Sequence, residues 1–202
     1  MRRALLLPCA LVLAAGCGDD GGPVTDPDAA TVDAAIDAAP DAAIDAPAGP
    51  FALTSTAFTE GMTIPAVHTC NGPNTSPPLA WGPGPAGTMS YAVVLTDQTN
   101  MLVHWVIYDI PANRFELPAD VDKTYAPADV LGAHQTRAYD NQVIGYLGPC
   151  PPNLHTYQFA IYALDVPTLP GATMTTTRPQ AVAAIGAHDL AMATLTGRYM
   201  QP

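Results

Sequence analysis

The segment Tyr91-Ala92-Val93-Val94-Leu95-Thr96-Asp97 is apolar or β-branched at nearly every position before it ends in two polar residues. A short continuous apolar run of this kind indicates a β-strand that is buried on both faces, as at the centre of a sheet. Residues 102–110 and 156–165 have the same character, and residues 51–55 alternate between apolar and polar side chains. These segments therefore predict a protein that is mainly β.

Turns rich in proline and glycine separate the predicted strands, at residues 73–78, 82–87 and 148–152. Only one stretch, from Pro179 to about Thr196, favours a helix, because Pro179 suits the first helical turn. Apolar residues recur there at near-helical spacing: Ala181, Val182, Ile185, Leu190, Ala193 and Leu195. We expect His188, inside this helix, to pack or to cap. The pattern predicts an antiparallel β-sandwich with a late helix, rather than alternating βαβ units.

The charge of the chain is unevenly distributed. The formal net charge is -11, and of the 18 acidic residues eight lie before Phe51. From Phe51 onward ten acidic residues face five basic ones, which are scattered along the chain. Binding to nucleic acid requires clustered Lys and Arg that displace counterions from phosphates. Nucleic acid is therefore excluded as an expected partner.

The first 17 residues predict export. Arg2 and Arg3 precede a short apolar run, which Pro8 interrupts and which is too short for a retained membrane-spanning helix. The run ends in Leu13-Ala14-Ala15-Gly16-Cys17, which resembles the lipobox of bacterial lipoproteins. We therefore predict a signal peptide that ends at a lipidated Cys17 and places the protein in the bacterial envelope, facing the periplasm or on the outer membrane. Ordinary signal cleavage, with Cys17 left as a thiol, is the alternative.

Residues 18–50 predict a disordered linker. They are rich in Asp, Ala and Pro, and acidic residues four positions apart repel one another along any helix. Almost no large apolar side chains are present to offset the entropy of ordering such a segment. We expect a spacer that joins a membrane anchor to one domain at residues 51–202. An acidic cation-binding tail is the alternative.

Cys70 and Cys150 are the only cysteines of the predicted domain. In an exported protein an isolated pair more often forms a disulfide than a metal site or a nucleophile. A bond between them would close a long loop and stabilise the fold by up to about 4 to 5 kcal/mol.

Three local patterns carry side chains that can do chemistry. Asp97 ends the central strand, and His104 lies on the strand that follows, on one face with Val106 and Tyr108. After the turn at residues 148–152, His155 and Tyr157 share a face because side chains alternate along a strand. Imidazole and phenol groups can donate hydrogen bonds to an anion, whereas Asp97 would accept a proton from an imidazole and orient the ring.

These patterns together resemble the phosphatidylethanolamine-binding protein family, in its bacterial branch that is often called Raf kinase inhibitor-like. The resemblance runs from about Phe51 to Tyr199. It rests on segments that occur in the family's order: Ser76-Pro77-Pro78-Leu79-Ala80-Trp81, Asp97, His104-Trp105, Gly148-Pro149-Cys150-Pro151-Pro152 and His155-Thr156-Tyr157. Residues 187–190 and 195–199 also look like the C-terminal region of that branch.

The resemblance implies a β-sandwich with a large central antiparallel sheet, a smaller sheet and a few peripheral helices. It also implies a surface pocket for phosphate-like or carboxylate-like anions, without a metal or a cofactor. Its walls would be Asp97, His104, the backbone of Gly148 and Pro149, His155 and Tyr157. In this sequence Gln98-Thr99-Asn100 follows Asp97, where the family often has a second carboxylate and two prolines. We therefore expect a more open and less acidic rim.

The leading hypothesis is a non-catalytic protein that binds a small anion or a phospholipid headgroup. A module that binds an envelope protein, and inhibits a hydrolase or kinase, is the alternative that the resemblance also implies. A hydrolase is a third alternative, because Asp97 and two histidines could form a hydrolytic site. The sequence shows no recognisable nucleophile elbow. The same residues could hold a metal, since two histidines and a carboxylate are a common ligand set.

Overall fold

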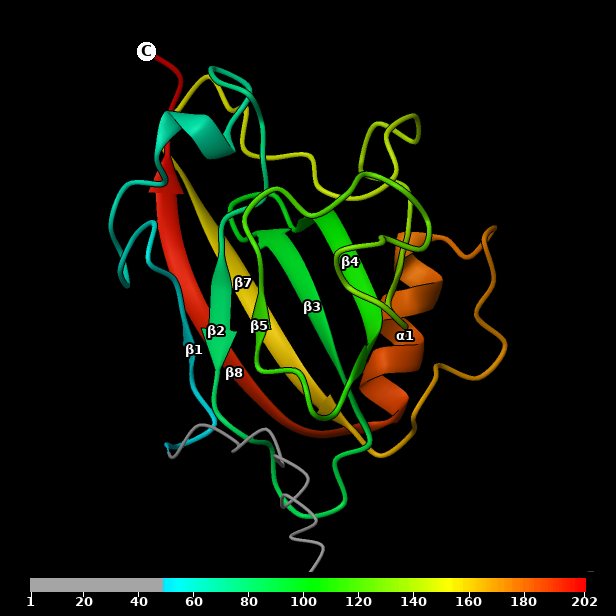
Figure 1. Ribbon diagram of the computed structural model, residues 1–202. Helices are drawn as coiled ribbons and strands as arrows, with labels where there is room; N and C mark the ends of the chain where they lie inside the picture. Colours follow the sequence, from blue (N-terminus) through cyan, green and yellow to red (C-terminus); the bar gives the residue numbers. More distant parts are fainter. Residues whose placement is uncertain (1–48) are drawn as a thin grey trace, which may run out of the picture. The chain divides into compact units, whose positions relative to one another are not determined.

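The computed structural model describes residues 49–202 and places them in two antiparallel β-sheets with one α-helix near the C-terminus (Figure 1). The predicted signal segment, Cys17 and residues 18–48 of the predicted linker lie outside the described residues. Among residues 49–202, no helix is long and apolar enough to cross a membrane. The predicted β-sandwich is thus confirmed for the described part of the chain.

The larger sheet has five strands in the order β6-β4-β3-β7-β8, and every pairing in it is antiparallel. The strands are β3 (Ser90–Asp97), β4 (Leu102–Pro111), β6 (His134–Gln135), β7 (His155–Leu164) and β8 (Asp189–Tyr199). The central strand β3 contains the whole apolar run from Tyr91 to Asp97. Because β3 pairs with both β4 and β7, the ends of these three strands lie side by side and position the residues of the pocket.

The smaller sheet has three short strands in the order β1-β2-β5. They are β1 (Leu53–Thr54), β2 (Leu79–Trp81) and β5 (Glu116–Leu117), and a short 3-10 helix, η1 (Ala66–His68), lies between the first two in the chain. In Figure 1 this sheet lies over one face of the larger sheet, and the α-helix α1 (Arg178–Ala187) lies at its other side. Each face of the larger sheet is therefore covered.

Two buried clusters occupy these two faces. Tyr91, Val93 and Leu95 of β3 belong to a large cluster that includes side chains of the smaller sheet, such as Trp81. The alternate residues Ala92 and Val94 belong to a second cluster with Ile185 of α1. Successive side chains of a strand point to opposite faces, so a strand covered on both faces must be apolar at every position. This explains the continuous apolar run.

The predicted helix from Pro179 to about Thr196 is correct only in its first half. Helix α1 begins at Arg178, where Thr177 and Gln180 form a capping box, and it ends at Ala187. Residues from Asp189 onward form β8, which pairs with β7 along its length. Leu190 and Met192 are exposed on this strand, while Leu195 is buried. Because nearly every residue in this stretch is apolar or small, its sequence fits either period, and pairing with β7 decides the outcome.

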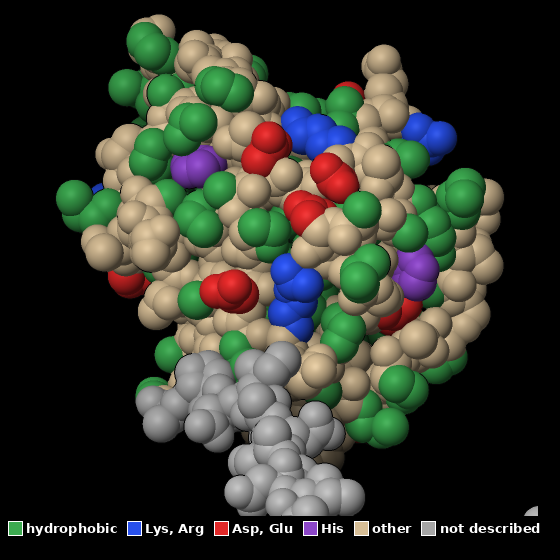
Figure 2. Space-filling view, in the orientation of Figure 1, with side chains coloured by type: hydrophobic (Ala, Val, Ile, Leu, Met, Phe, Trp, Pro, Cys, Tyr) green, Lys and Arg blue, Asp and Glu red, His purple; other side chains and the backbone are tan. Residues whose placement is uncertain are grey.

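His188 caps the C-terminal end of α1, and capping is one of the two roles expected for it. Its Nδ1 atom lies 2.8 Å from Oδ1 of Asp165. The predicted disulfide between Cys70 and Cys150 is confirmed, with the two Cα atoms 5.3 Å apart. On the face of the molecule in Figure 2, acidic and basic side chains are interspersed and form no continuous basic patch.

Candidate functional site

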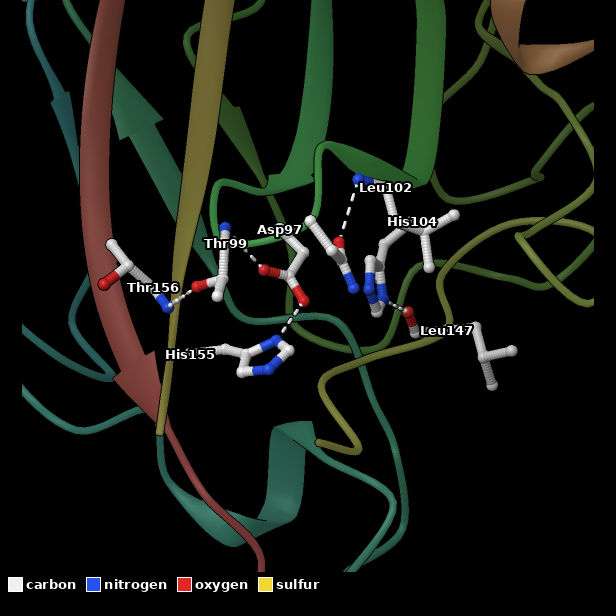
Figure 3. Close-up of polar contacts among 8 residues, drawn as sticks. Asp97, Thr99, Leu102, His104, Leu147, His155 and Thr156 are labelled. Carbon is white, nitrogen blue, oxygen red and sulfur yellow. Dashed lines mark hydrogen bonds and ion pairs between the residues drawn. The ribbon is translucent and has the colours of Figure 1, made fainter. Parts of the chain in front are cut away.

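Antiparallel pairing brings four predicted site residues to one end of the larger sheet. Asp97 is the last residue of β3, His104 is the third of β4, and His155 and Tyr157 are the first and third of β7. The register places Asp97 opposite Tyr157, and His155 opposite Tyr199 near the C-terminus. The close-up shows Asp97 between the two imidazole rings (Figure 3). The pairing of the strands thus brings together three segments that are far apart in the sequence.

All four residues line one surface pocket of about 180 Å³. A water molecule occupies about 30 Å³ in the liquid, so the pocket admits a ligand of only a few non-hydrogen atoms or the head of a larger one. The predicted grouping of Asp97, His104, His155 and Tyr157 around one pocket therefore agrees with the geometry. Six further residues complete the lining: Asn100, Leu102, Tyr139, Cys150, Pro151 and Pro152.

Asp97 is a buried carboxylate with two donors. Nδ1 of His155 lies 2.6 Å from Oδ2 of Asp97, and the backbone N–H of Thr99 donates to Oδ1 at 2.9 Å. Only 2% of Asp97 is exposed, and burial by itself would raise the pKa of its carboxyl group. The hydrogen bonds from His155 and Thr99 outweigh burial, so the pKa of Asp97 is lowered. Asp97 is therefore ionised at neutral pH and fixes the orientation of the His155 ring.

His104 is held from the other side of the pocket. Its Nδ1 atom lies 3.0 Å from the carbonyl oxygen of Leu147, which can only accept, so Nδ1 carries the proton. Burial lowers the pKa of His104, and the carbonyl of Leu147 counteracts this effect only in part. The ring is therefore neutral at pH 7, with the lone pair on Nε2. Two tyrosine rings surround it, with centroid distances of 4.4 Å to Tyr139 and 5.4 Å to Tyr157.

Tyr157 is a buried hydroxyl donor beside the acidic group. Burial raises the pKa of Tyr157, and the nearby charge of Asp97 raises it further. The phenol therefore keeps its proton throughout the physiological pH range. It supplies a neutral O–H group to this end of the sheet.

Gly148 and Pro149, whose backbone the family resemblance implies as part of the pocket, are not among the residues that line the cavity, although the backbone of Gly148 contributes to raising the pKa of His104. The N–H of Gly148 donates to Oδ1 of Asn74 at 2.7 Å, so it is already used within the protein. A Cβ atom at position 148 would lie 2.1 Å from the carbonyl oxygen of His68, so the position accepts only glycine. Pro149 has no N–H, and its carbonyl accepts from the N–H of Cys70. The two residues shape the loop rather than supply donors.

The turn after Asp97 differs from the family pattern in a specific way. Asn100 lines the pocket with a neutral amide, and its Oδ1 atom accepts from the N–H of Leu102 at 3.0 Å. Met101 has a positive φ of 61° and is exposed at the tip of the turn. Asp97 is consequently the one carboxylate among the residues that line the pocket.

Tyr139 is a pocket residue that the sequence analysis missed. It lies in a loop between β6 and β7 with no periodic pattern that could mark it. Arg178, the first residue of α1, holds this loop by donating from Nη1 to the carbonyl oxygens of Arg137, at 3.0 Å, and Ala138. The contact of the Tyr139 ring with His104 depends on these tertiary interactions, which the local sequence does not encode.

Within residues 49–202, no group of three or more His, Cys, Asp or Glu side chains is arranged to hold a metal ion. His104 and His155 each direct Nδ1 to a protein oxygen. The arrangement can instead offer a ligand two imidazole edges in an environment of aromatic and proline side chains.

The fold and the pocket together define the class of the protein, which is a β-sandwich with a pocket at one end of its larger sheet. Comparison with known proteins agrees with this class. Residues 54–200 match the phosphatidylethanolamine-binding protein family, and the chain belongs to this family.

Two relatives illustrate the similarity in sequence, and both are designated UPF0098 proteins. The protein from Aquifex aeolicus is 38% identical over 128 residues, which are 59% of this chain and 72% of the relative. The protein from Methanothermobacter thermautotrophicus is 35% identical over 154 residues, which are 73% of this chain and 97% of the relative.

Two solved structures are similar in fold. The crystal structure of Escherichia coli YbcL, described as a new member of the mammalian PEBP family, has 30% sequence identity and a TM-score of 0.69. The match covers 76% of this chain and 100% of YbcL. The PEBP homologue CT736 of Chlamydia trachomatis has 30% identity and a TM-score of 0.64, over 75% of this chain and 98% of CT736.

Proposed function

We propose that this protein is a non-catalytic binding protein of the bacterial envelope, and that its pocket takes a small anion such as phosphate or a phosphate-containing headgroup. One observation carries the proposal. The Nδ1 atoms of His104 and His155 are both held by protein oxygens, of Leu147 and Asp97, at the edge of one pocket. In the described part of the chain, the hydrogen bonds of both rings use Nδ1, so Nε2 of each ring is left for a ligand.

The protonation state of the two imidazole rings determines whether Nε2 of each ring can donate a hydrogen bond to an anion. No Lys or Arg is among the residues that line the pocket, so among them only a protonated imidazole can offer an anion a positive charge, beside the neutral donors of Tyr157 and Asn100. A phosphate group suits this situation, because its oxygens accept from an imidazolium and its monohydrogen form can donate to a neutral Nε2. Binding is therefore coupled to proton uptake or to the protonation state of the ligand.

The lining favours binding over reaction. Cys150 is the one thiol-derived side chain among the lining residues, and it is held in the disulfide. No Ser or Thr is among these lining residues, so a hydroxyl nucleophile of the usual kind is not at hand. The name of the family supports a phosphate-containing headgroup as the ligand. Asp97 already accepts from His155 and Thr99, so we infer that the phosphate, rather than an amine, provides most of the recognition.

A titration tests the pocket directly. Phosphate, phosphoethanolamine and acetate would each be added to the full chain while the imidazole signals of its histidines are followed by NMR. We expect the signals of His104 and His155 to shift with phosphate and phosphoethanolamine, and binding to be lost in the double variant His104→Ala, His155→Ala. The matched control is His188→Ala, which removes an exposed His–Asp pair at the end of α1 and should leave binding unchanged. Absence of a shift at both pocket histidines with every ligand would refute the site.

The envelope location rests on the sequence before residue 18, and a separate experiment tests it. We expect the full chain, expressed in a bacterium with a labelled fatty acid, to incorporate the label and to fractionate with membranes. The variant Cys17→Ser should lose both properties, because it lacks the thiol that would carry the lipid. Equal membrane association of this variant would show that Cys17 is not the anchor.

A further inference from the structure

Cys150 has two roles in the structure, since it lines the pocket and is covalently joined to Cys70. Both cysteines are exposed at the surface. Neither belongs to the two hydrophobic clusters that form the core. The disulfide is thus part of the wall of the pocket, and a reductant in solution can reach it.

The loop that contains Cys150 touches both sides of the ligand space. Its residue Leu147 accepts from Nδ1 of His104, and Cys150, Pro151 and Pro152 line the pocket beside Tyr157. The backbone of Cys150 also lowers the pKa of Tyr157, against the larger effect of burial. A change in the position of this loop would therefore alter the surroundings of His104 and Tyr157 together.

Hydrogen bonds also hold residues 148–151 of the loop, and each of the following three joins them to another loop or to the chain end. Asn74 accepts from the N–H of Gly148, Cys70 donates to the carbonyl of Pro149, and Gln201 donates to the carbonyl of Pro151. Among the described residues, the disulfide is the one covalent link between this loop and the segment after η1. If it is opened, the hydrogen bonds remain, so we expect the wall to relax without unfolding of the sheets.

We propose that the Cys70–Cys150 disulfide is a redox control of the pocket, such that its reduction weakens anion binding while the domain stays folded; this inference rests on the proposed function. A dithiol is the reductant: one of its thiolates attacks a sulfur of the disulfide and forms a mixed disulfide, and its second thiol releases the protein. Two electrons and two protons pass to the protein, which then carries two cysteine thiols, and the dithiol becomes a disulfide.

The test compares the oxidised and reduced forms of the full chain. Dithiothreitol would be added without denaturant, and the free thiols would be counted by alkylation and mass spectrometry. Phosphate is then titrated into each form, with the His104 ring signal as the readout and near-UV circular dichroism as the measure of folding. We expect reduction to weaken phosphate binding about tenfold. The double variant Cys70→Ser, Cys150→Ser should bind as weakly as the reduced form and should not respond to dithiothreitol.

Each possible result of this experiment either supports or overturns the redox proposal. Equal phosphate affinity in the two forms would overturn the proposal. So would a disulfide that dithiothreitol reduces only in denaturant, or a loss of the near-UV signal on reduction, because the bond would then serve stability alone. If the oxidised form binds no phosphate, the proposed function fails. The redox inference, which rests on that function, fails with it, whereas equal affinity in the two forms overturns the redox inference alone.

Discussion

Nδ1 of His155 lies 2.6 Å from Oδ2 of Asp97, so the first residue of β7 is tied to the last residue of β3. Residues 49–202 contain two further pairs of this kind, His134–Asp109 at 3.0 Å and His188–Asp165 at 2.8 Å. The exposed fractions of the three aspartate side chains are 2%, 5% and 51%. The same pair of groups thus occurs in three environments that differ in the burial of the carboxylate.

We expect the variant Asp97→Asn to be less stable than the wild type at pH 7, by about 1.5 to 3 kcal/mol, because it weakens charge-assisted hydrogen bonds at a buried position. The pKa of Asp97 is lowered in the folded protein, with burial opposing and the bonds from His155 and Thr99 favouring ionisation. The unfolded state therefore takes up its proton first as the pH falls, and this part of the stability is lost on acidification. Urea unfolding at pH 7 and pH 3 should show the difference between variant and wild type shrinking.

The matched control is Asp165→Asn. Its carboxylate is half exposed, so removal of its charge should change the free energy of unfolding by less than about 0.5 kcal/mol at either pH. A difference between Asp97→Asn and the wild type that stays the same at pH 7 and pH 3 would contradict the assignment of Asp97 as the ionised partner.

Asp109 should behave in the opposite way, because burial raises the pKa of its carboxyl group despite the bonds from Leu169 and His134. A raised pKa in the folded state means that the group contributes stability at low pH, and that this is lost as the pH rises through the folded-state pKa. Asn at position 109 keeps an oxygen for the N–H of Leu169 and tolerates the φ of 59° found there. We therefore expect the stability of Asp109→Asn, relative to the wild type, to increase from pH 4 to pH 7.

Urea unfolding over this pH range measures the effect. A loss of stability in Asp109→Asn that grows with pH would show that the ion pair with His134 outweighs the burial of the charge.

Most of the sheet could be predicted from the sequence, because strands covered on both faces must be continuously apolar, as Val93 and Val94 show. The helix prediction failed beyond Ala187, because an edge strand such as β8 needs no strict alternation and its alanines also suit a helix. The cluster of Asp97, His104 and His155 followed from strand ends and the family resemblance. The use of the Gly148 N–H by Asn74 could not be predicted, because it joins residues 74 positions apart in two irregular loops.

Two glycines should respond oppositely to replacement by alanine. A Cβ atom at Gly197 of β8 would lie 2.6 Å from Cγ1 of Ile64 and 3.0 Å from Cε2 of Phe58, within the buried core. We expect Gly197→Ala to lower the free energy of unfolding by about 1 to 3 kcal/mol through overpacking. Gly186 lies in α1 with no atom within 4 Å of the added Cβ, so Gly186→Ala should raise it by about 0.5 to 1 kcal/mol.

Denaturant unfolding of the two variants beside the wild type checks both expectations. A destabilised Gly186→Ala variant would show that α1 is packed differently from the structure, and an unchanged Gly197→Ala variant would show the same for the contact between β8 and Ile64.

The protonation of His104 should make anion binding depend on pH. Burial lowers the pKa of His104, and its Nδ1–H faces the carbonyl of Leu147, so the neutral ring offers a ligand the lone pair of Nε2. Sulfate carries no proton between pH 6 and pH 8 and can be bound by this ring only after the ring is protonated. Its affinity should therefore rise as the pH falls from 8 to 6, by up to about tenfold per pH unit for one proton taken up.

Phosphate can donate its own proton to Nε2, so we expect its affinity to depend less on pH than that of sulfate. Calorimetric titrations at pH 6, 7 and 8, repeated in buffers that differ in ionisation enthalpy, give both the affinities and the number of protons taken up. The variant His104→Asn has no titrating ring, and the pH dependence for sulfate should be smaller in it. If sulfate binds the wild type equally well at pH 6 and pH 8, the imidazole of His104 is not the donor, and the charge that holds an anion in this pocket must come from elsewhere.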